Sequence, residues 1–206
     1  MHHIISDGAS LVILFRELIT LYMACAKKMP SPLAENRLQY IDYAVWQRQW
    51  LGEDRLGSQL DYWQQQLAHT PPLLDLPLDY LRPAVQSFDG DTVQESFDPD
   101  YFKALQTLCH QHEVTPFMVM LLSWQLLLSK YTNQQDIVVG VPTLGRHHPD
   151  LDSVVGFFIQ SLALRTTLAD NPSVFTALEQ VRETVLDGFT HSDVPIDLII
   201  ERLGIP

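Results

Sequence analysis

The most constraining feature of the chain is the stretch DIVVGV at residues 136–141, which is almost entirely apolar. Its β-branched residues favour a strand, and the lack of polar alternation indicates that other elements cover both faces of that strand. Segments with the apolar spacing of amphipathic helices precede and follow it. A covered strand between helices predicts an α/β fold, and leaves open whether the strand pairing is purely parallel or mixed.

Capping and turn residues divide the rest of the chain into elements. Asp98 and Pro99 begin one helix, and Thr115 with Pro116 places an N-cap before a proline at the first helical position of the next. The helices predicted in this way cover residues 9–28, 40–51, 57–67, 98–112, 115–131, 173–189 and 195–204. The predicted strands cover residues 92–97 and 136–141, and a further strand begins near residue 154.

A Pro- and Asp-rich segment interrupts this series between residues 71 and 90 (PPLLDLPLDYLRPAVQSFDG). Such a composition predicts a long irregular crossing, and long crossings commonly separate parts of a protein. We therefore expect residues 1–85 and residues 86–206 to belong to two different lobes. No internal repeat or low-complexity tract is present in the sequence.

Composition disfavours several classes of function. The chain has 13 Lys and Arg against 25 Asp and Glu, so its net charge of −12 repels nucleic-acid phosphates and anionic lipid surfaces. The densest apolar run, residues 117–128, is too short to span a bilayer, and no basic-then-apolar leader is visible. Cys25 and Cys109 lie in apolar helical patterns and are expected to be buried thiols. We expect a cytoplasmic protein that binds neither nucleic acid nor membrane.

The N-terminal stretch MHHIISDG gathers two histidines, an aspartate and a glycine. Ile4 and Ile5 are expected at the end of a buried strand, on which His2 and His3 would face opposite sides and have different roles. In the turn that follows, Asp7 fits a carboxylate that holds the turn or an imidazole by hydrogen bonds. The alternative without function is that His2 and His3 are the remainder of a purification tag, or two ordinary histidines.

In the same turn, Gly8 fits a residue that permits tight backbone geometry. His2, His3 and Asp7 lack the spacing of known zinc motifs, so no metal is expected.

The extended string HHIISDG matches HHxxxDG and resembles the signature of the condensation domains of nonribosomal peptide synthetases, which belong with the chloramphenicol acetyltransferase-like acyltransferases. Further blocks resemble that family in the same order along essentially the whole chain. These are residues 40–48 (YIDYAVWQR), 61–63 (DYW), 76–79 (LPLD) with 82–83 (RP), 131–140 (YTNQQDIVVG), 155–162 (VGFFIQSL) and 191–196 (HSDVPI). The chain departs from the family pattern at three places, with Gln160-Ser161 for Asn-Thr, Ser192 for Gln and Ile196 for Phe.

Several aromatic and histidine residues in or near these blocks are explained by packing or solvent exposure and do not require a functional role. Trp46 and Trp63 are expected to pack in a lobe, and so are Phe157 and Phe158, because large aromatics dominate protein cores. The His147-His148 pair follows Gly-Arg and predicts a solvated turn.

The resemblance implies a chloramphenicol acetyltransferase-like two-lobed fold, of which this chain holds the end of the first lobe and most of the core of the second. We therefore expect one incomplete condensation domain, with family sequence continuing beyond both ends. The resemblance also implies that the aspartate of the motif pairs with an arginine upstream of it.

The same resemblance implies an acyltransferase that forms a peptide bond between aminoacyl or peptidyl thioesters. The thioesters are carried on the phosphopantetheine arms of partner carrier domains, next to an adenylation domain, and no cofactor is bound by the condensation domain itself. His3 would be catalytic, either as a base or by positioning the amine. His2, Asp7 and Gly8 would support it, while Gln160 and Ser161 would contact the site or its tunnel from the second lobe.

Two other functions stay open at this point. The chain alone could be an inactive fragment that serves at most as an interaction surface for carrier domains or neighbouring modules. The same fold could also catalyse epimerisation of a carrier-bound residue, or acyl transfer to a hydroxyl.

Overall fold

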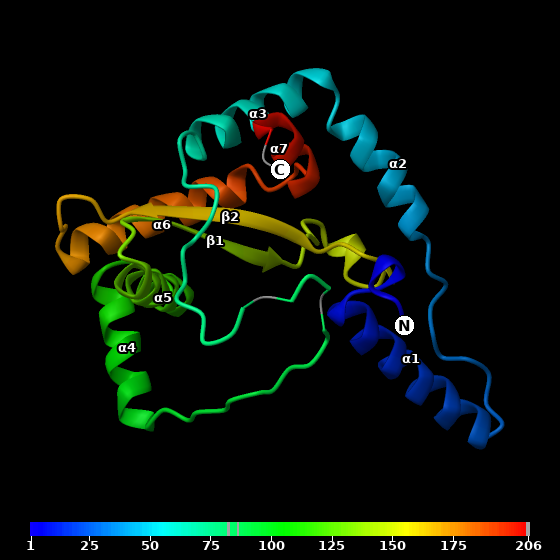
Figure 1. Cartoon of the computed structure of the whole chain (residues 1–206). Coiled ribbons are helices and arrows are strands. Elements are labelled where there is room, and N and C mark those ends of the chain that lie inside the picture. Colours follow the sequence, from blue (N-terminus) through cyan, green and yellow to red (C-terminus); the bar gives the residue numbers. More distant parts are fainter. Residues whose placement is uncertain (82, 86, 205–206) are drawn as a thin grey trace. The chain divides into compact units, whose positions relative to one another are not determined.

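The computed structural model of the chain describes residues 1–81, 83–85 and 87–204 (Figure 1). These residues form two compact units that alternate along the sequence. Unit 1 comprises Met1–Ala68, Gly140–Ala163 and the described residues from Phe189 onward, whereas unit 2 comprises His69–Val139 and Leu164–Gly188. Strands β1 (Asp136–Thr143) and β2 (Gln160–Thr167) pair in a two-stranded sheet, and each strand contributes residues to both units.

Most of unit 1 is helical. Its elements are η1 (His3–Ile5), α1 (Gly8–Ala26), α2 (Tyr40–Trp50), α3 (Glu53–Gln66), η2 (Pro149–Leu151) and α7 (Ile196–Leu203). The helices predicted from the apolar spacing over residues 9–28, 40–51 and 195–204 are confirmed to within two residues at each end. The helix expected from residue 57 begins four residues earlier, at Glu53.

The buried strand predicted at Ile4 and Ile5 is wrong. His3–Ile5 is a single turn of 3₁₀ helix, and both isoleucines are exposed. Local hydrogen bonds explain the difference, because the His2 side chain accepts from the amide of Ile4, and the amide of Ser6 donates to the carbonyl of His3. Backbone groups satisfied within one turn are not available for a strand ladder.

Unit 2 holds α4 (Pro99–Gln111), α5 (Pro116–Thr132) and most of α6 (Val174–Thr190). All three confirm the helices predicted there, including the caps at Asp98 and Thr115. Helices α4 and α5 pack against each other, and α5 buries Gln125 as well as apolar residues. The Gln125 side chain donates 3.2 Å to the carbonyl of Leu164 in β2, so even the polar member of this face has a backbone partner.

The strand predicted over residues 92–97 is also wrong. These residues are irregular and exposed, and within the described residues they pair with neither β1 nor β2. The irregular crossing predicted over residues 71–90 is confirmed in its described residues. Arg82 of the LPLDYLRP block and Gln86, where the second lobe is predicted to begin, lie outside the described residues, and the boundary after residue 85 stays a prediction.

Helix α1 departs from the sequence expectations in two ways. Cys25, expected to be buried, is exposed near the end of the helix, whereas Cys109 in α4 is buried as predicted. At 19 residues, α1 is also the one helix among the described residues that is long and apolar enough to cross a bilayer, by length and composition alone. Core helices of soluble proteins meet the same test, and the cytoplasmic location stays a prediction.

Trp63 anchors the C-terminal part of unit 1. Its side chain is 1% exposed, and its indole N–H donates 2.8 Å to the carbonyl of His191. Helix α3, which carries Trp63, lies beside α7, where Ile199 is also buried (Figure 1). Trp63 thus combines a large buried ring with a hydrogen bond to a backbone carbonyl.

Replacing Trp63 with Phe keeps an aromatic ring but removes the indole donor, and leaves the carbonyl of His191 without this partner. We expect a loss of about 1–3 kcal/mol in the free energy of unfolding, measured by urea denaturation. The matched control is Trp124→Phe, at a half-exposed indole on α5, which should change stability by about 0.5 kcal/mol or less. Equal effects of the two substitutions would contradict the anchoring role of Trp63.

Candidate functional site

The carboxylate of Asp7 lies at the centre of the N-terminal motif and is only 2% exposed. One carboxylate oxygen accepts from the amide and the hydroxyl of Ser10, each at 2.7 Å, which makes Asp7 the N-cap of α1. The other oxygen accepts from the amide of Phe158 at 3.2 Å. The Ser10 hydroxyl also bonds the backbone of Gly156, so the motif is tied to a segment about 150 residues away.

This connection explains why β2 does not begin near residue 154, as the sequence predicts. The amides of Gly156 and Phe158 donate to the side chains of Ser10 and Asp7 rather than to a neighbouring strand. The segment therefore stays irregular until β2 begins at Gln160.

Arg146 supplies the positive charge that the buried carboxylate requires. Its guanidinium lies 3.2 Å from Asp7, and both side chains are at most 5% exposed. The same guanidinium donates to the carbonyls of Leu151 and Val154 and stacks over the Phe158 ring, 4.1 Å from its centroid. The expectation that the arginine lies upstream of the motif is wrong, because Arg146 follows β1, 139 residues downstream of Asp7.

Sequence analysis could have found Arg146 only through its chemistry. A carboxylate predicted to hold a turn needs a partner once it is buried, and Arg146 stands directly before the His147-His148 turn. The sequence offers several arginines, however, and spacing alone does not select among them.

Burial alone would raise the pKa of the Asp7 carboxyl. The hydrogen bonds from Ser10 and Phe158, together with the positive charge of Arg146, outweigh burial and lower that pKa below its ordinary value. Asp7 is therefore a fixed anion that holds neighbouring groups and has no tendency to exchange protons near neutral pH.

His3 is the residue predicted to be catalytic, and its ring has a defined orientation. Its Nδ1 lies 2.8 Å from the carbonyl of Ser6. A carbonyl oxygen only accepts, so Nδ1 carries the proton in the neutral ring and Nε2 keeps its lone pair. The ring meets Phe157 edge to face at 5.2 Å between centroids, and within the described residues Nε2 has no hydrogen-bond partner. The arrangement leaves a basic nitrogen exposed on an oriented ring.

His2 has a different environment. Its Nδ1 accepts 3.1 Å from the amide of Ile4, and its carbonyl accepts from the hydroxyl of Ser6. The two imidazole rings thus have different hydrogen-bond partners, although they do not face opposite sides of a strand as expected. His2 caps the 3₁₀ turn that carries His3, and its supporting role stays a prediction.

The tight backbone geometry expected at Gly8 occurs instead at Gly145. A Cβ on Gly8 would meet no atom within 4 Å, and its φ is not positive. Gly145 has φ +62°, and a Cβ there would lie 1.8 Å from the carbonyl oxygen of Phe158. A glycine is therefore required immediately before Arg146, where the chain passes against the segment that bonds Asp7.

The structure does not bring Gln160 and Ser161 to His3. Gln160 is the first residue of β2, and its carbonyl accepts 3.3 Å from the Thr143 hydroxyl. Its side chain lines a pocket of about 520 Å³ that lies wholly within unit 1. Ser161 does not line that pocket. A role of either residue in substrate contact stays a prediction.

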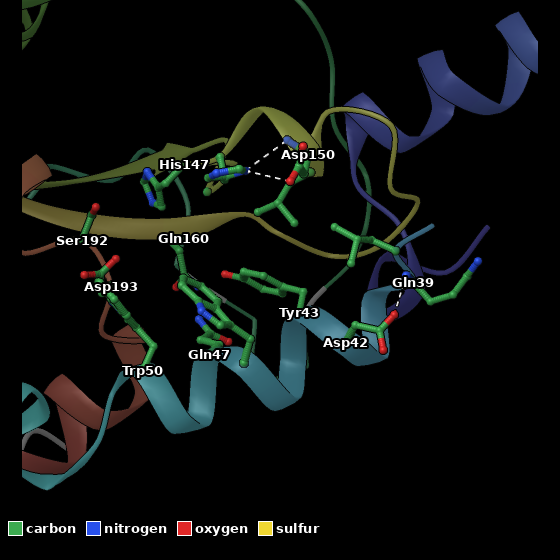
Figure 2. Close-up of a pocket in the computed structure, with 15 residues that line it drawn as sticks. Gln39, Asp42, Tyr43, Gln47, Trp50, His147, Asp150, Gln160, Ser192 and Asp193 are labelled. Carbon is green, nitrogen blue, oxygen red and sulfur yellow. Dashed lines mark hydrogen bonds and ion pairs between the residues drawn. The ribbon is translucent and has the colours of Figure 1, made fainter. Parts of the chain in front are cut away.

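The pocket opens beside α2 and has one aromatic wall (Figure 2). Tyr43, Trp46 and Trp50 form this wall, and Trp46, expected to pack in a lobe, is 49% exposed. The pocket also has polar and acidic groups from other segments of unit 1. They include Asp42, His147, His148, Asp150, Gln160, Ser192 and Asp193. His147 and His148 lie in an exposed turn, as predicted.

Among the described residues, no group of three or more His, Cys, Asp or Glu side chains is placed to hold a metal ion. The polar groups of the site instead bond one another and the backbone. Bases and hydrogen-bonding groups are the chemistry that these residues offer.

Comparison with known proteins places this geometry in a family. A family model described as "Condensation domain" matches residues 1–206. The chain belongs to the condensation domain family. It is 45% identical to malpinin synthetase of Mortierella alpina and 42% identical to tyrocidine synthase 3 of Brevibacillus parabrevis, over its full length in both cases. The chain spans only 3% of each of these two relatives.

Solved structures agree with the α/β condensation-domain fold predicted from the sequence. The X-domain from teicoplanin biosynthesis superposes with a TM-score of 0.92 at 27% identity, covering all of this chain and 47% of the X-domain chain. This agreement confirms the fold class, and the family model confirms the family resemblance carried by HHxxxDG.

Replacing Asp7 with Ala would leave the Arg146 guanidinium buried without its counter-ion. We expect a loss of about 3–5 kcal/mol in the free energy of unfolding. The control is Asp100→Ala, in an exposed ion pair with Lys103, which should cost about 1 kcal/mol or less of that free energy.

Because the folded pKa of Asp7 is lowered, the stabilisation of the wild type relative to Asp7→Asn should be complete above about pH 5 and shrink as pH falls below about 4. Urea denaturation over this pH range measures both effects, and a difference that grows on acidification would contradict the anionic role.

Replacing Gly145 with Ala should cost at least about 2 kcal/mol of stability, because the new Cβ combines a left-handed conformation with a collision against Phe158. Gly140→Ala is the matched control, since nothing lies within 4 Å of a Cβ there, and it should change stability by about 0.5 kcal/mol or less. Thermal unfolding of both variants compares them, and a Gly145→Ala variant as stable as Gly140→Ala would contradict the close approach.

Proposed function

We propose that this chain carries the site at which a condensation domain forms a peptide bond between two carrier-bound thioesters. The observation that supports the proposal is the environment of His3. The buried Asp7 and Arg146 hold the turn after His3, and the bond from Nδ1 to Ser6 orients the ring with Nε2 available as a base. Membership of the condensation domain family gives this ring its chemical context.

The proposed reaction joins the α-amino group of an acceptor to the thioester carbonyl of a donor. An α-amino group has a pKa of about 7.7–8.0, so about a tenth to a fifth of it is neutral at about pH 7 and attack needs no strong base. As the C–N bond forms and the C–S bond breaks, the nitrogen must lose a proton while the thiolate leaves. Nε2 of His3 can accept that proton, or can hold the amine against the carbonyl.

The proposal implies partners rather than a resident cofactor. Donor and acceptor would arrive on the phosphopantetheine arms of carrier domains, and an adenylation domain would load the acceptor. The support is that the relatives are synthetases many times longer than this chain. His2, Asp7 and Gly8 would act by keeping the 3₁₀ turn and the start of α1 in place.

A second candidate function is an interaction surface without catalysis. It is favoured by the similarity to the X-domain from teicoplanin biosynthesis, because a structure of that X-domain is a complex with OxyB. In this case the fold would be retained for partner binding, and the exposed ring of His3 would have no catalytic role.

The experiment that separates these functions is His3→Ala in the complete synthetase that contains this chain. We expect at least about a 100-fold loss of dipeptidyl product on the downstream carrier, measured by mass spectrometry, because general base catalysis contributes that much. His110→Ala, at an exposed imidazole near the end of α4, is the control and should leave product formation unchanged. Unchanged product with His3→Ala would remove His3 from the mechanism, and absence of product from the wild type as well would favour the interaction surface.

A further inference from the structure

The pocket beside α2 contains three acidic groups, two of which form no ion pair within the described residues. Asp42, Asp150 and Asp193 line it, whereas none of its lining residues is Lys or Arg. Asp150 pairs at 3.5 Å with His148. Asp42 accepts from the amide of Gln39 and Asp193 from the side chain of Gln59, so within the described residues neither forms an ion pair. Asp42 and Asp193 therefore bring negative charge to the pocket without an ion-pair partner among the described residues.

The same pocket is also lined by aromatic rings of α2, and the face of an aromatic ring attracts positive charge. Trp46 stacks on Trp50 at 5.3 Å between centroids, and Tyr43 lies 5.9 Å from Trp46. The guanidinium of Arg55 already lies 3.5 Å from the centroid of the Trp50 ring. One ring of this row thus already binds a cation in the structure itself, and Trp46 and Tyr43 line the same pocket.

Tyr43 is the ring under the electrostatic influence of one of these carboxylates. Burial, followed by the influence of Tyr40 and of Asp193, raises the pKa of the Tyr43 phenol to about 12, so the ring is neutral and near the Asp193 carboxylate. A cation in the pocket would therefore meet a carboxylate and a neutral aromatic ring together. Opposite charges in a partly enclosed site interact more strongly than the same charges in bulk water.

We infer that this pocket is a binding site for a small organic cation of the alkylammonium class. Its volume of about 520 Å³ lies within the range of small-molecule pockets. The carboxylates, the aromatic rings and the lack of lining Lys or Arg would attract such a cation whether or not the chain forms peptide bonds.

The pocket is connected to the histidine motif through two consecutive residues. The His3 ring contacts Phe157, and the Tyr43 ring contacts Phe158 at 4.8 Å between centroids. If the chain has the proposed function, the pocket would bind the basic side chain of an aminoacyl substrate, such as a lysyl or ornithyl group. This assignment rests on the proposed function. The site would then select substrates by charge, while the chemistry takes place at His3.

The test titrates the chain with n-butylamine, and with n-butanol and butyrate as neutral and anionic probes of similar size. Binding is followed by NMR, through the chemical shifts of the tryptophan indole N–H groups. The resonances of Trp46 and Trp50 report on the pocket, and those of Trp63 and Trp124 serve as internal references. We expect saturable shifts of the first pair with butylamine and at least tenfold weaker binding of the other two probes. Equal binding of butylamine and butanol would overturn the inference.

Asp193→Asn keeps the shape of the side chain and removes its charge. It should weaken butylamine binding three- to tenfold and leave butanol binding unchanged. Asp89→Asn, at an exposed residue away from the pocket, is the matched control and should have no effect. If Asp193→Asn does not fold, Asp150→Asn replaces it with the same expectation. An Asp193→Asn variant that binds butylamine as Asp89→Asn does would also overturn the inference.

The substrate assignment is tested separately in the complete synthetase. Condensation with a lysyl acceptor is compared with condensation of its uncharged norleucyl counterpart. We expect the wild type to prefer lysyl and Asp193→Asn to reduce that preference by a similar three- to tenfold factor. Butylamine binding without any preference would reject the assignment to a substrate side chain but retain the site. Loss of all condensation by the wild type would instead count against the proposed function.

Discussion

The structure of unit 1 depends on one buried ion pair. The carboxylate of Asp7 and the guanidinium of Arg146 lie 3.2 Å apart, and the two side chains form further hydrogen bonds with Ser10, Phe158 and two carbonyls. A buried pair is tolerable only when such additional bonds are made, because removing two charges from water costs several kcal/mol each. The pair joins the start of α1 to the segment between the two strands, so it connects parts of the chain that are remote in sequence.

The properties of the histidine motif follow from this arrangement. His2 and His3 lie on a short 3₁₀ turn whose own hydrogen bonds are local, and such a turn is not stable in isolation. The ion pair fixes the residue that follows the turn, and Phe157 supports the His3 ring from the segment that Asp7 bonds. The orientation of an exposed imidazole is thereby coupled to a buried carboxylate four residues away.

The excess of acidic residues affects both the whole chain and one pocket. A net charge of −12 disfavours binding of phosphate-rich partners. In the pocket beside α2 the same excess of carboxylates meets a row of indole and phenol rings, and both kinds of group favour a cation. Repulsion of polyanions and attraction of a small cation therefore have the same electrostatic origin.

Much of the local structure was determined by the sequence itself. The helices capped by Asp98 and Thr115 and the strand at DIVVGV depend on capping and on apolar spacing, which act over a few residues, and the HHxxxDG string placed the chain in its family. Only the tertiary structure decided that Arg146 is the partner of Asp7, that β2 begins at Gln160, and that Trp46 faces a pocket. Each of these outcomes depends on contacts between residues about 100 or more positions apart, and such contacts leave no periodic pattern in the sequence. The wrong strand at Ile4 has a different, local origin, because the bonds from the Ile4 amide to His2 and from the Ser6 amide to His3 competed with a ladder that the apolar pattern alone favoured.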